Sequence, residues 1–232
     1  RPDYYIVISQ TVADRIKKYY GRESVVIYPP LTSFVIASEA KQSSNSNGIA
    51  TSSANWRTPR NDRRGQGYFL IVSRLVPYKR IDIAIEAFNK LGWPLTIVGT
   101  GRQEGWLKTI AGPTISFLQN LTDSDLSRYY QDCTAFIFPG IEDLGLAVLE
   151  AQSFGKPVIA YRGGGAVETV IEGKTGMFFS PQRADALINT LKHFNAKKFD
   201  PKDCIENAER FSKERFKREF MQFVEEAIII NL

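Results

Sequence analysis

Two glutamates, Glu142 and Glu150, are eight positions apart in the stretch EDLGLAVLE. If a helix begins near Leu144, Glu150 lies on the stripe that such a helix would bury. A carboxylate on a buried face costs several kcal/mol unless it is paired or accepts hydrogen bonds. A ligand diol such as a ribose could donate two hydrogen bonds to this carboxylate. The alternative interpretation is a half-exposed glutamate. The expected stripe comprises Leu146, Leu149, Glu150, Ser153 and Phe154.

Glu142 precedes this helix, where a loop carboxylate can face the reacting end of a ligand. Gly145 would allow the backbone N–H groups of the first helical turn to approach an anion closely. The alternative is an ordinary acid at a helix start. The assignment of Glu150 therefore has a physical argument that the assignment of Glu142 lacks.

Two cations follow an apolar run in SRLVPYKR, namely Arg74 and Lys79. A guanidinium forks onto phosphate oxygens, and an ammonium acts as a point charge. With a helix start close by, the pair is suited to a pyrophosphate. The competing interpretation is a pair of surface charges flanking a helix.

Glycines follow two further apolar runs. Gly99 and Gly101 in VGTGRQEGW allow a tight turn and close backbone approach to a ligand. The dinucleotide fingerprint G-x-G-x-x-G is broken because Glu104 stands at its third glycine, so a nicotinamide site is only weakly indicated. In YRGGGAVETV the glycines again suggest close approach, and Glu168 could cap a helix or bind a ligand, with a plain glycine turn as the alternative.

The elements that must position these residues alternate regularly from Tyr68 onward. Continuous apolar runs alternate with helical periodicity, which predicts a parallel sheet covered by helices on both faces. Ligands of such sheets bind beyond the carboxyl ends of the strands. Predicted strands are 68–73, 94–99, 114–118, 134–139, 156–161 and 175–179, and predicted helices are 80–91, 102–111, 122–133, 144–154, 166–172, 181–194, 201–211 and 213–229.

Three segments of different character make up the chain. Residues 1–31 read as a β-α-β fragment that is too small to be a domain. Residues 32–66 are rich in Ser, Asn, Arg and Gly and are interpreted as a flexible insertion or linker. Residues 67–232 form the regular α/β domain. The arginines of the insertion are either phosphate contacts or, more simply, part of a solvated loop: Arg57, Arg60, Arg63 and Arg64.

Composition excludes several classes of site. The chain has 232 residues, 43% of them apolar, a formal net charge of +5 and a pI near 9.1. A mild positive balance suits anionic small molecules, membrane surfaces or nucleic acid without choosing among them. A single histidine, His193, and two cysteines, Cys133 and Cys204, give zinc clusters and histidine triads almost no support. No apolar run is long enough to span a bilayer.

The motifs together resemble one family. SRLVPYKRID, IVGTGRQEGWLK, FLQNLTDSDLSRYYQDC, FPGIEDLGLAVLEAQSFGKPVIAYRGGGAVETVIEGKTG and AERFSKERF are similar to the nucleotide-binding half of retaining GT-B glycosyltransferases, most closely the family 4 type. The resemblance covers about Tyr68 to Leu232. It implies a Rossmann-like domain that binds a GDP-sugar or UDP-sugar, with Arg74 and Lys79 on the diphosphate.

The same resemblance implies roles for the other residues. Glu150 would bind the ribose, Glu142 would face the donor sugar, and the backbone at Gly145 and Leu146 would meet the distal phosphate. The catalytic set would be Glu142, Arg74 and Lys79, with Gly99 and Gly101 also at the donor. No metal or other cofactor is expected.

The implied activity is transfer of a sugar, with a mild preference for mannose, to a glycan or lipid-linked acceptor in polysaccharide biosynthesis. Residues 1–31 would be the end of an N-terminal domain that is otherwise missing and on which turnover depends. The alternative is a non-catalytic nucleotide-binding module left by a truncated or split gene. An epimerase or phosphorylase of related architecture comes third. We expect a cytoplasmic protein that does not bind nucleic acid, with peripheral contact at the inner face of the membrane in its full-length form.

Overall fold

A computed structural model of the chain describes residues 3–31 and 67–230. The segment 32–66, which the sequence marks as an insertion, lies outside the described residues. The centre is a six-stranded sheet in the order β5-β4-β3-β6-β7-β8, and every pairing is parallel. This confirms the predicted Rossmann-like parallel sheet. Its strands are β3 (Phe69–Val72), β4 (Leu95–Val98), β5 (Ile115–Leu118), β6 (Ala135–Phe138), β7 (Val158–Tyr161) and β8 (Gly176–Phe179).

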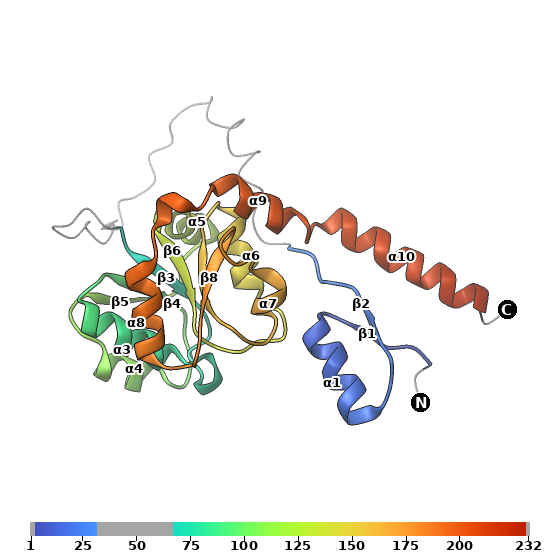
Figure 1. Ribbon diagram of the computed structural model, residues 1–232, viewed down its shortest axis with the longest axis horizontal. Coiled ribbons are helices and arrows are strands. Elements are labelled where there is room, and N and C mark those ends of the chain that lie inside the picture. The colour runs from blue at the N-terminus through green and yellow to red at the C-terminus, as the bar shows by residue number, and fades with distance from the viewer. Residues whose placement is uncertain (1–2, 32–66, 231–232) are drawn as a thin grey trace.

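Helices cover both faces of this sheet (Figure 1). The first face carries α3 (Ile81–Leu91), α4 (Glu104–Ile110) and α8 (Ala184–His193). The second carries α5 (Asp123–Asp132), α6 (Leu146–Ser153) and α7 (Ala166–Thr169). The connections between parallel strands therefore pack as the alternation of strand and helix patterns predicts. A short 3-10 turn at Pro77–Lys79 precedes α3, and another at Ala196–Lys198 follows α8. The helices α9 (Pro201–Glu209) and α10 (Lys213–Ile230) come next.

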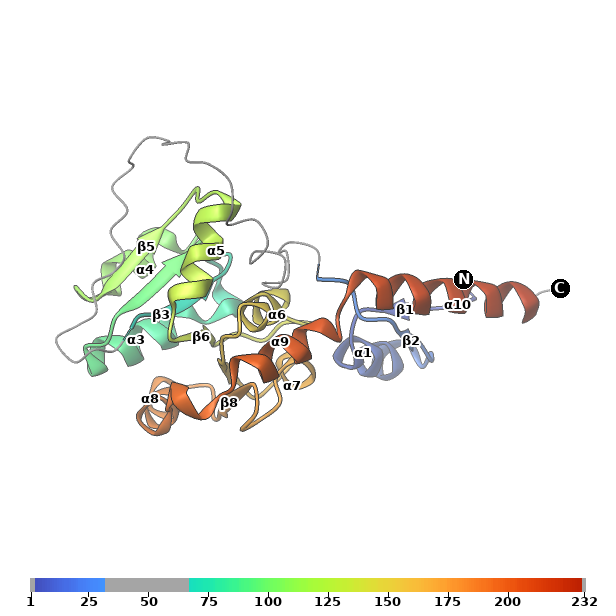
Figure 2. The same cartoon turned by 90° about the horizontal axis from the view of Figure 1, so that it is seen from above.

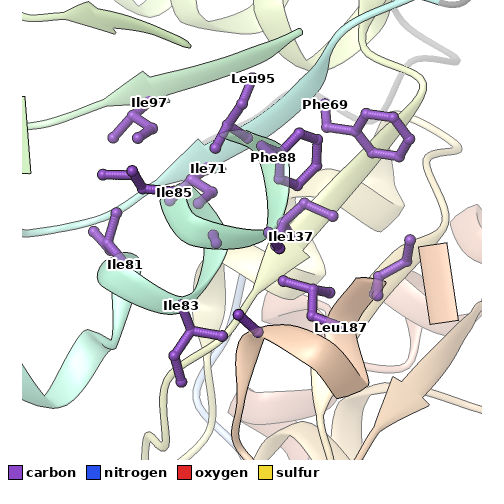
Figure 3. Packing of buried hydrophobic residues seen from close by; sticks show 14 of the residues in the cluster. Phe69, Ile71, Ile81, Ile83, Ile85, Phe88, Leu95, Ile97, Ile137 and Leu187 are labelled. Carbon is purple, nitrogen blue, oxygen red and sulfur yellow. The ribbon is translucent and has the colours of Figure 1, made fainter. Parts of the chain in front are cut away.

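Side chains of each strand alternate between two apolar cores. Phe69 and Ile71 of β3 pack with Phe88 of α3 on the first face, as Figure 3 shows. Leu70, between them, belongs to the core of the second face. Because both faces are buried, the strands read in the sequence as continuous apolar runs rather than as an alternating pattern.

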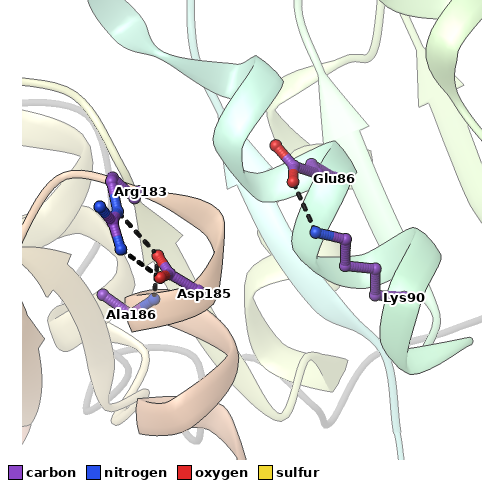
Figure 4. Close-up of polar contacts among 5 residues, drawn as sticks. All are labelled: Glu86, Lys90, Arg183, Asp185 and Ala186. Carbon is purple, nitrogen blue, oxygen red and sulfur yellow. Dashed lines mark hydrogen bonds and ion pairs between the residues drawn. The ribbon is translucent and has the colours of Figure 1, made fainter.

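Polar side chains form local contacts at helix starts and on the solvent side of the domain. The Thr122 hydroxyl oxygen accepts a hydrogen bond from the Asp125 N–H at 3.2 Å, so Thr122 is the N-cap of α5. On the solvent side of α3 and at the start of α8, ion pairs join Glu86 to Lys90 and Arg183 to Asp185 (Figure 4). Such exposed pairs each contribute at most about 1 kcal/mol. The two cores therefore dominate the stability of this domain.

The N-terminal residues form a separate β-α-β unit, as the sequence predicts. It consists of β1 (Ile6–Val7), α1 (Gln10–Tyr20) and β2 (Val25–Val26), with β1 and β2 paired in parallel. Helix α10 leaves the sheet and runs beside this unit in both views (Figures 1 and 2). Tyr4 packs edge-on against Phe223 of α10, and Arg215 donates to the Tyr28 carbonyl at 2.6 Å.

Glu168 of α7 anchors the start of α1. Its carboxylate accepts hydrogen bonds from the backbone N–H groups of Gln10 at 2.7 Å and Thr11 at 2.9 Å. It also accepts from the hydroxyl groups of Thr11 at 2.6 Å and Tyr28 at 3.0 Å. A carboxylate at a helix N-terminus is favoured by the free N–H groups and by the helix dipole. Glu168 was expected either to cap a helix or to bind a ligand. The structure shows that it caps α1, a helix far away in the sequence.

Replacing this carboxylate should loosen the N-terminal unit. Glu168→Gln replaces one acceptor oxygen with an N–H₂ group, which faces the N–H and O–H donors that the carboxylate now accepts from. The change should weaken the docking of α1 by about 1–3 kcal/mol. We expect trypsin to cut at Lys17 and Lys18 roughly tenfold faster than in the wild type. Glu86→Gln, which removes an exposed carboxylate from α3, is the matched control and should leave the cleavage rate unchanged. Equal rates for both variants would show that Glu168 does not hold α1.

Candidate functional site

The order of the strands reverses between β3 and β6, and the loops that follow these two strands lie in contact. The first loop begins at Ser73 and includes the turn Pro77–Lys79, and the second runs from Pro139 to Gly145. A Cβ atom on Gly140 would lie 2.8 Å from the Lys79 Cα, so the two backbones touch. Ligands of open parallel sheets bind at such a reversal, beyond the carboxyl ends of the strands. This crevice is therefore the candidate site.

Lys79 and Glu142 form an ion pair across the crevice. The Lys79 side chain is only 11% exposed and that of Glu142 is 24% exposed. Together with Ser73 and Gly140, they line a small cavity of about 10 Å³, roughly the volume that one water occupies. Of the predicted site residues, these two are the pair that the structure brings into direct contact.

The other residues of the first loop lie at the rim. Arg74 lies two residues beyond the end of β3 with an exposed side chain, and within the described residues no carboxylate pairs with it. Gly99 and Gly101 face the backbone of the same loop, where added Cβ atoms would lie 1.9 Å from the Ser73 carbonyl oxygen and 2.4 Å from that of Leu75. Close packing of two loops therefore accounts for both glycines. Their contact with a ligand stays a prediction.

The glycines that follow β7 support the Glu142 loop from behind. The Gly165 N–H donates to the Glu142 carbonyl at 2.7 Å. A Cβ atom on Gly165 would lie 2.2 Å from the Leu144 Cα, and one on Gly164, whose φ is +60°, would lie 2.5 Å from the Glu142 carbonyl oxygen. Gly164 and Gly165 of the GGG run are thus required for backbone-to-backbone contact with the site loop.

Helix α6 begins two residues later than the sequence predicts. Gly145 adopts φ +84° and ψ 64° and is the N-cap, so the first helical residue is Leu146 rather than Leu144. A residue in this left-handed region does not continue a helix, which explains the shift. The prediction that Leu146 belongs to the buried stripe is wrong, because its side chain is 42% exposed beside the crevice loop. Leu149 and Ser153 are buried as predicted.

Glu150 lies on the face of α6 that packs toward α5. The Tyr130 hydroxyl donates to the Glu150 Oε2 atom at 2.8 Å. Burial raises the pKa of the Glu150 carboxyl, and this hydrogen bond acts in the opposite direction. The buried carboxylate thus has a donor within the protein, which the sequence analysis did not foresee. No hydrogen bond among the described residues links Glu150 to Lys79 or Glu142.

Sequence reasoning missed three residues that build the site. Tyr130 occupies an ordinary apolar position of α5, and nothing in its spacing distinguishes it from its neighbour Tyr129. Gly140 sits in PGIED, whose proline and glycine indicate only a turn. Gly165 was recognised as part of a glycine run, but its partner loop was not. Only the strand order reveals which loops these glycines contact.

The described residues contain a second, larger opening. A cleft of about 600 Å³ opens between Tyr28, Glu168 and α10 and shares no lining residue with the crevice. Two of the three arginines that line it have protein partners: Arg210 donates to Asn207 at 3.0 Å, and Arg215 pairs with Glu219 at 2.7 Å. Within residues 3–31 and 67–230, no group of three metal-binding side chains occurs. No described helix is long and apolar enough to cross a membrane.

The strand order, the helices on both faces and the crevice at β3 and β6 define a Rossmann-like domain of the kind found in GT-B enzymes. The sequence profile of the family described as Glycosyl transferases group 1 matches residues 52–211. The chain belongs to this family.

Several relatives illustrate the similarity. The chain is 32% identical over 138 residues to a GDP-mannose-dependent alpha-(1-6)-phosphatidylinositol monomannoside mannosyltransferase of Mycolicibacterium smegmatis, an alignment covering 52% of this chain and 36% of that protein. A sucrose-phosphate synthase from Thermosynechococcus elongatus superimposes with a TM-score of 0.78 at 22% identity, covering 99% of this chain and 59% of its own. HepE of Anabaena, solved with UDP and glucose, superimposes with a TM-score of 0.73 at 20% identity. That match covers 96% of this chain and 62% of the HepE chain. The chain thus spans only part of the length of these proteins.

Gly165→Ala tests the support of the Glu142 loop. The added methyl group would overlap the Leu144 backbone, so the loop must move, and we expect a loss of about 1–3 kcal/mol in the free energy of unfolding. Gly105→Ala is the matched control, because a Cβ atom there meets nothing within 4 Å and the residue lies in α4. That change should stabilise the chain by about 0.5–1 kcal/mol. Urea unfolding measures both, and equal effects would refute the packing argument.

Glu150→Gln should stabilise the ligand-free chain at neutral pH. Burial raises the folded-state pKa of this carboxyl above its unfolded value, so its ionised form disfavours folding as pH rises through the folded pKa. The amide carries no charge and still accepts from Tyr130. We expect a gain on the order of 1 kcal/mol at pH 8 that shrinks toward pH 4. Urea unfolding at both pH values measures it, and a gain that does not depend on pH would contradict this assignment.

Proposed function

We propose that the chain is the donor-binding half of a retaining GT-B glycosyltransferase of the family 4 type. The observation that carries the proposal is the Lys79–Glu142 pair in the crevice where the strand order reverses. A cation and a carboxylate in one crevice match the two ends of a sugar nucleotide, which carries an anionic diphosphate and a reacting sugar carbon. Family membership makes glycosyl transfer the reaction to which this geometry belongs.

Each residue then has a role in the reaction. Lys79 and Arg74 bind the diphosphate and stabilise the negative charge that grows on it as the sugar departs. The uncapped start of α6 at Gly145 and Leu146 presents backbone N–H groups to the distal phosphate. Glu142 faces the donor sugar, and Glu150 accepts hydrogen bonds from the ribose. These cations and N–H groups take the charge-stabilising role without a metal ion, and Gly99 and Gly101 bring the rim of the crevice close to the donor.

The ion pair sets an order of events. In the ligand-free chain Glu142 neutralises Lys79, whereas the Arg74 side chain is exposed at the rim. An arriving diphosphate meets Arg74 first and then competes with Glu142 for Lys79. The exchange frees the Glu142 carboxylate next to the sugar. Donor binding thus places the carboxylate and the anion in their reacting positions in one step.

The donor is a GDP-sugar or a UDP-sugar. The M. smegmatis relative is named for GDP-mannose and the HepE structure contains UDP, so the relatives support both bases. We favour mannose, transferred to a glycan or lipid-linked acceptor. We place the protein in the cytoplasm, with peripheral contact at the inner face of the membrane in its full-length form.

The acceptor would bind on a second wall supplied by an N-terminal domain. In this proposal residues 1–31 are the end of that domain, 32–66 an insertion and 67–232 the donor domain. The support is that the T. elongatus structure contains the whole fold of this chain and is matched over only 59% of its own length. The alternative is a non-catalytic nucleotide-binding module. The upstream reading frame separates the two, because a glycine-rich domain in frame indicates an enzyme and a stop codon indicates the module.

Binding of nucleotides tests the proposal directly. Calorimetric titration with UDP, GDP and their glucose and mannose esters should show binding of at least one of them, because both diphosphate cations belong to this chain. If none of these ligands binds at millimolar concentration, the proposal is refuted.

Substitutions test the diphosphate assignment in the same assay. Lys79→Ala and Arg74→Ala should each weaken binding of the nucleoside diphosphate at least about tenfold, since each removes a charge-assisted hydrogen bond. Binding of the parent nucleoside should change little. Lys90→Ala, which removes an exposed ion-paired lysine from α3, is the control and should leave both affinities unchanged. Equal losses for nucleotide and nucleoside would contradict the assignment.

A further inference from the structure

Tyr130 is a fully buried side chain with little freedom to move. Its ring is stacked on Phe154, with the ring centroids 5.4 Å apart and an angle of 6° between the planes. Phe136 of β6 contacts the ring as well, at a centroid distance of 5.9 Å. Side chains packed this closely occupy one rotamer. The Tyr130 hydroxyl is therefore held in one place, at the edge of the core of the second face.

That hydroxyl is placed on one oxygen of Glu150. The hydrogen bond to Oε2 is 2.8 Å long and joins α5 to α6. A carboxylate can accept about four hydrogen bonds, and among the described residues only the Tyr130 hydroxyl donates to that of Glu150. A free glutamate side chain loses rotamer entropy when a ligand fixes it. Here the loss occurs on folding, before any ligand arrives.

We propose that Tyr130 is a positioning residue, which fixes Glu150 in the rotamer that receives the ribose hydroxyl groups of the donor. The inference rests on the proposed function, because it takes Glu150 to be the ribose acceptor. Tyr130 itself does not touch the donor and acts through the carboxylate. Nothing in the family resemblance or in the names of the relatives assigns a role to this residue.

The electrostatics of the pair fit this role. Burial raises the pKa of the Glu150 carboxyl, and the hydrogen bond from Tyr130 lowers it. The pKa of the Tyr130 hydroxyl is raised well above its ordinary value by burial and by the adjacent carboxylate, so the tyrosine stays a donor at any physiological pH. The hydroxyl thus favours the ionised carboxylate, which is the stronger acceptor for a diol.

The test compares ligands with and without ribose hydroxyl groups. UDP and GDP are titrated beside their 2′,3′-dideoxy forms into the wild type and Tyr130→Phe. We expect Tyr130→Phe to lose about fivefold or more in affinity for the ribonucleotide and less than twofold for the dideoxy form. A general structural defect would weaken both ligands alike. Tyr68→Phe is the matched control, because the buried Tyr68 hydroxyl donates at 2.8 Å to the carbonyl of Tyr129 in α5, the helix that carries Tyr130. This control variant should leave the ratio of the two affinities unchanged.

A second background covers the case in which Tyr130→Phe fails to fold. In Glu150→Ala, which removes the acceptor of the Tyr130 hydroxyl, adding Tyr130→Phe removes an unpaired hydroxyl and should leave the ratio of ribonucleotide to dideoxy affinity within twofold. A further loss in that background would show that Tyr130 does not act through the Glu150 carboxylate, and would overturn the inference.

The outcomes also separate this inference from the proposed function. If the wild type binds neither nucleotide, the proposed function falls and the inference falls with it. If the wild type prefers the ribonucleotide and Tyr130→Phe keeps the full preference, the inference alone is overturned. If the wild type binds both forms equally, Glu150 is not the ribose acceptor, and the positioning role is refuted while diphosphate binding stands.

Discussion

The partly buried ion pair between Lys79 and Glu142 is the constraint on which the site depends. Desolvation of two charges is unfavourable, and their attraction repays it only when the geometry is well held. Two independent supports provide that geometry. Lys79 ends the 3-10 turn that starts at Pro77, and the Glu142 carbonyl accepts the Gly165 N–H. The pair therefore joins loops whose positions are fixed by the sheet and by the glycine turn.

Close backbone contact explains why so many glycines surround this crevice. The three loops that follow β3, β4 and β6 meet at the carboxyl ends of these strands. A fourth loop, which follows β7, packs behind them. Side chains at Gly99, Gly140 or Gly165 would push these loops apart, since each added Cβ atom would lie less than 3.0 Å from a backbone atom of the neighbouring loop. The crevice is thus built from backbone, which leaves its few side chains free for chemistry. The same packing keeps the cavity small within this chain.

The sequence predicted the parallel sheet because each strand is buried on both faces and reads as an unbroken apolar run. It also predicted that chemistry gathers at strand ends, and Lys79 and Glu142 do meet there. The start of α6 was misplaced because a positive φ at Gly145 cannot be told from a helical glycine by spacing. The sequence could not predict the Tyr130–Glu150 hydrogen bond or the contact of Glu168 with α1. Each joins elements that become neighbours only through tertiary packing.

The segment from Gly165 to Glu168 links the site to the N-terminal unit. Gly165 holds the Glu142 carbonyl, and three residues later Glu168 binds the first turn of α1. A second link, Arg15 to Asp143 at 2.5 Å, is exposed and contributes at most about 1 kcal/mol. Hydrogen bonds to a charged carboxylate contribute more, about 1.5–3 kcal/mol each, and Glu168 accepts several. Motion of the N-terminal unit would therefore reach the Glu142 loop through α7 rather than through the surface ion pair. If residues 1–31 end an acceptor domain, as proposed above, this short helix is where the two walls of the crevice are joined.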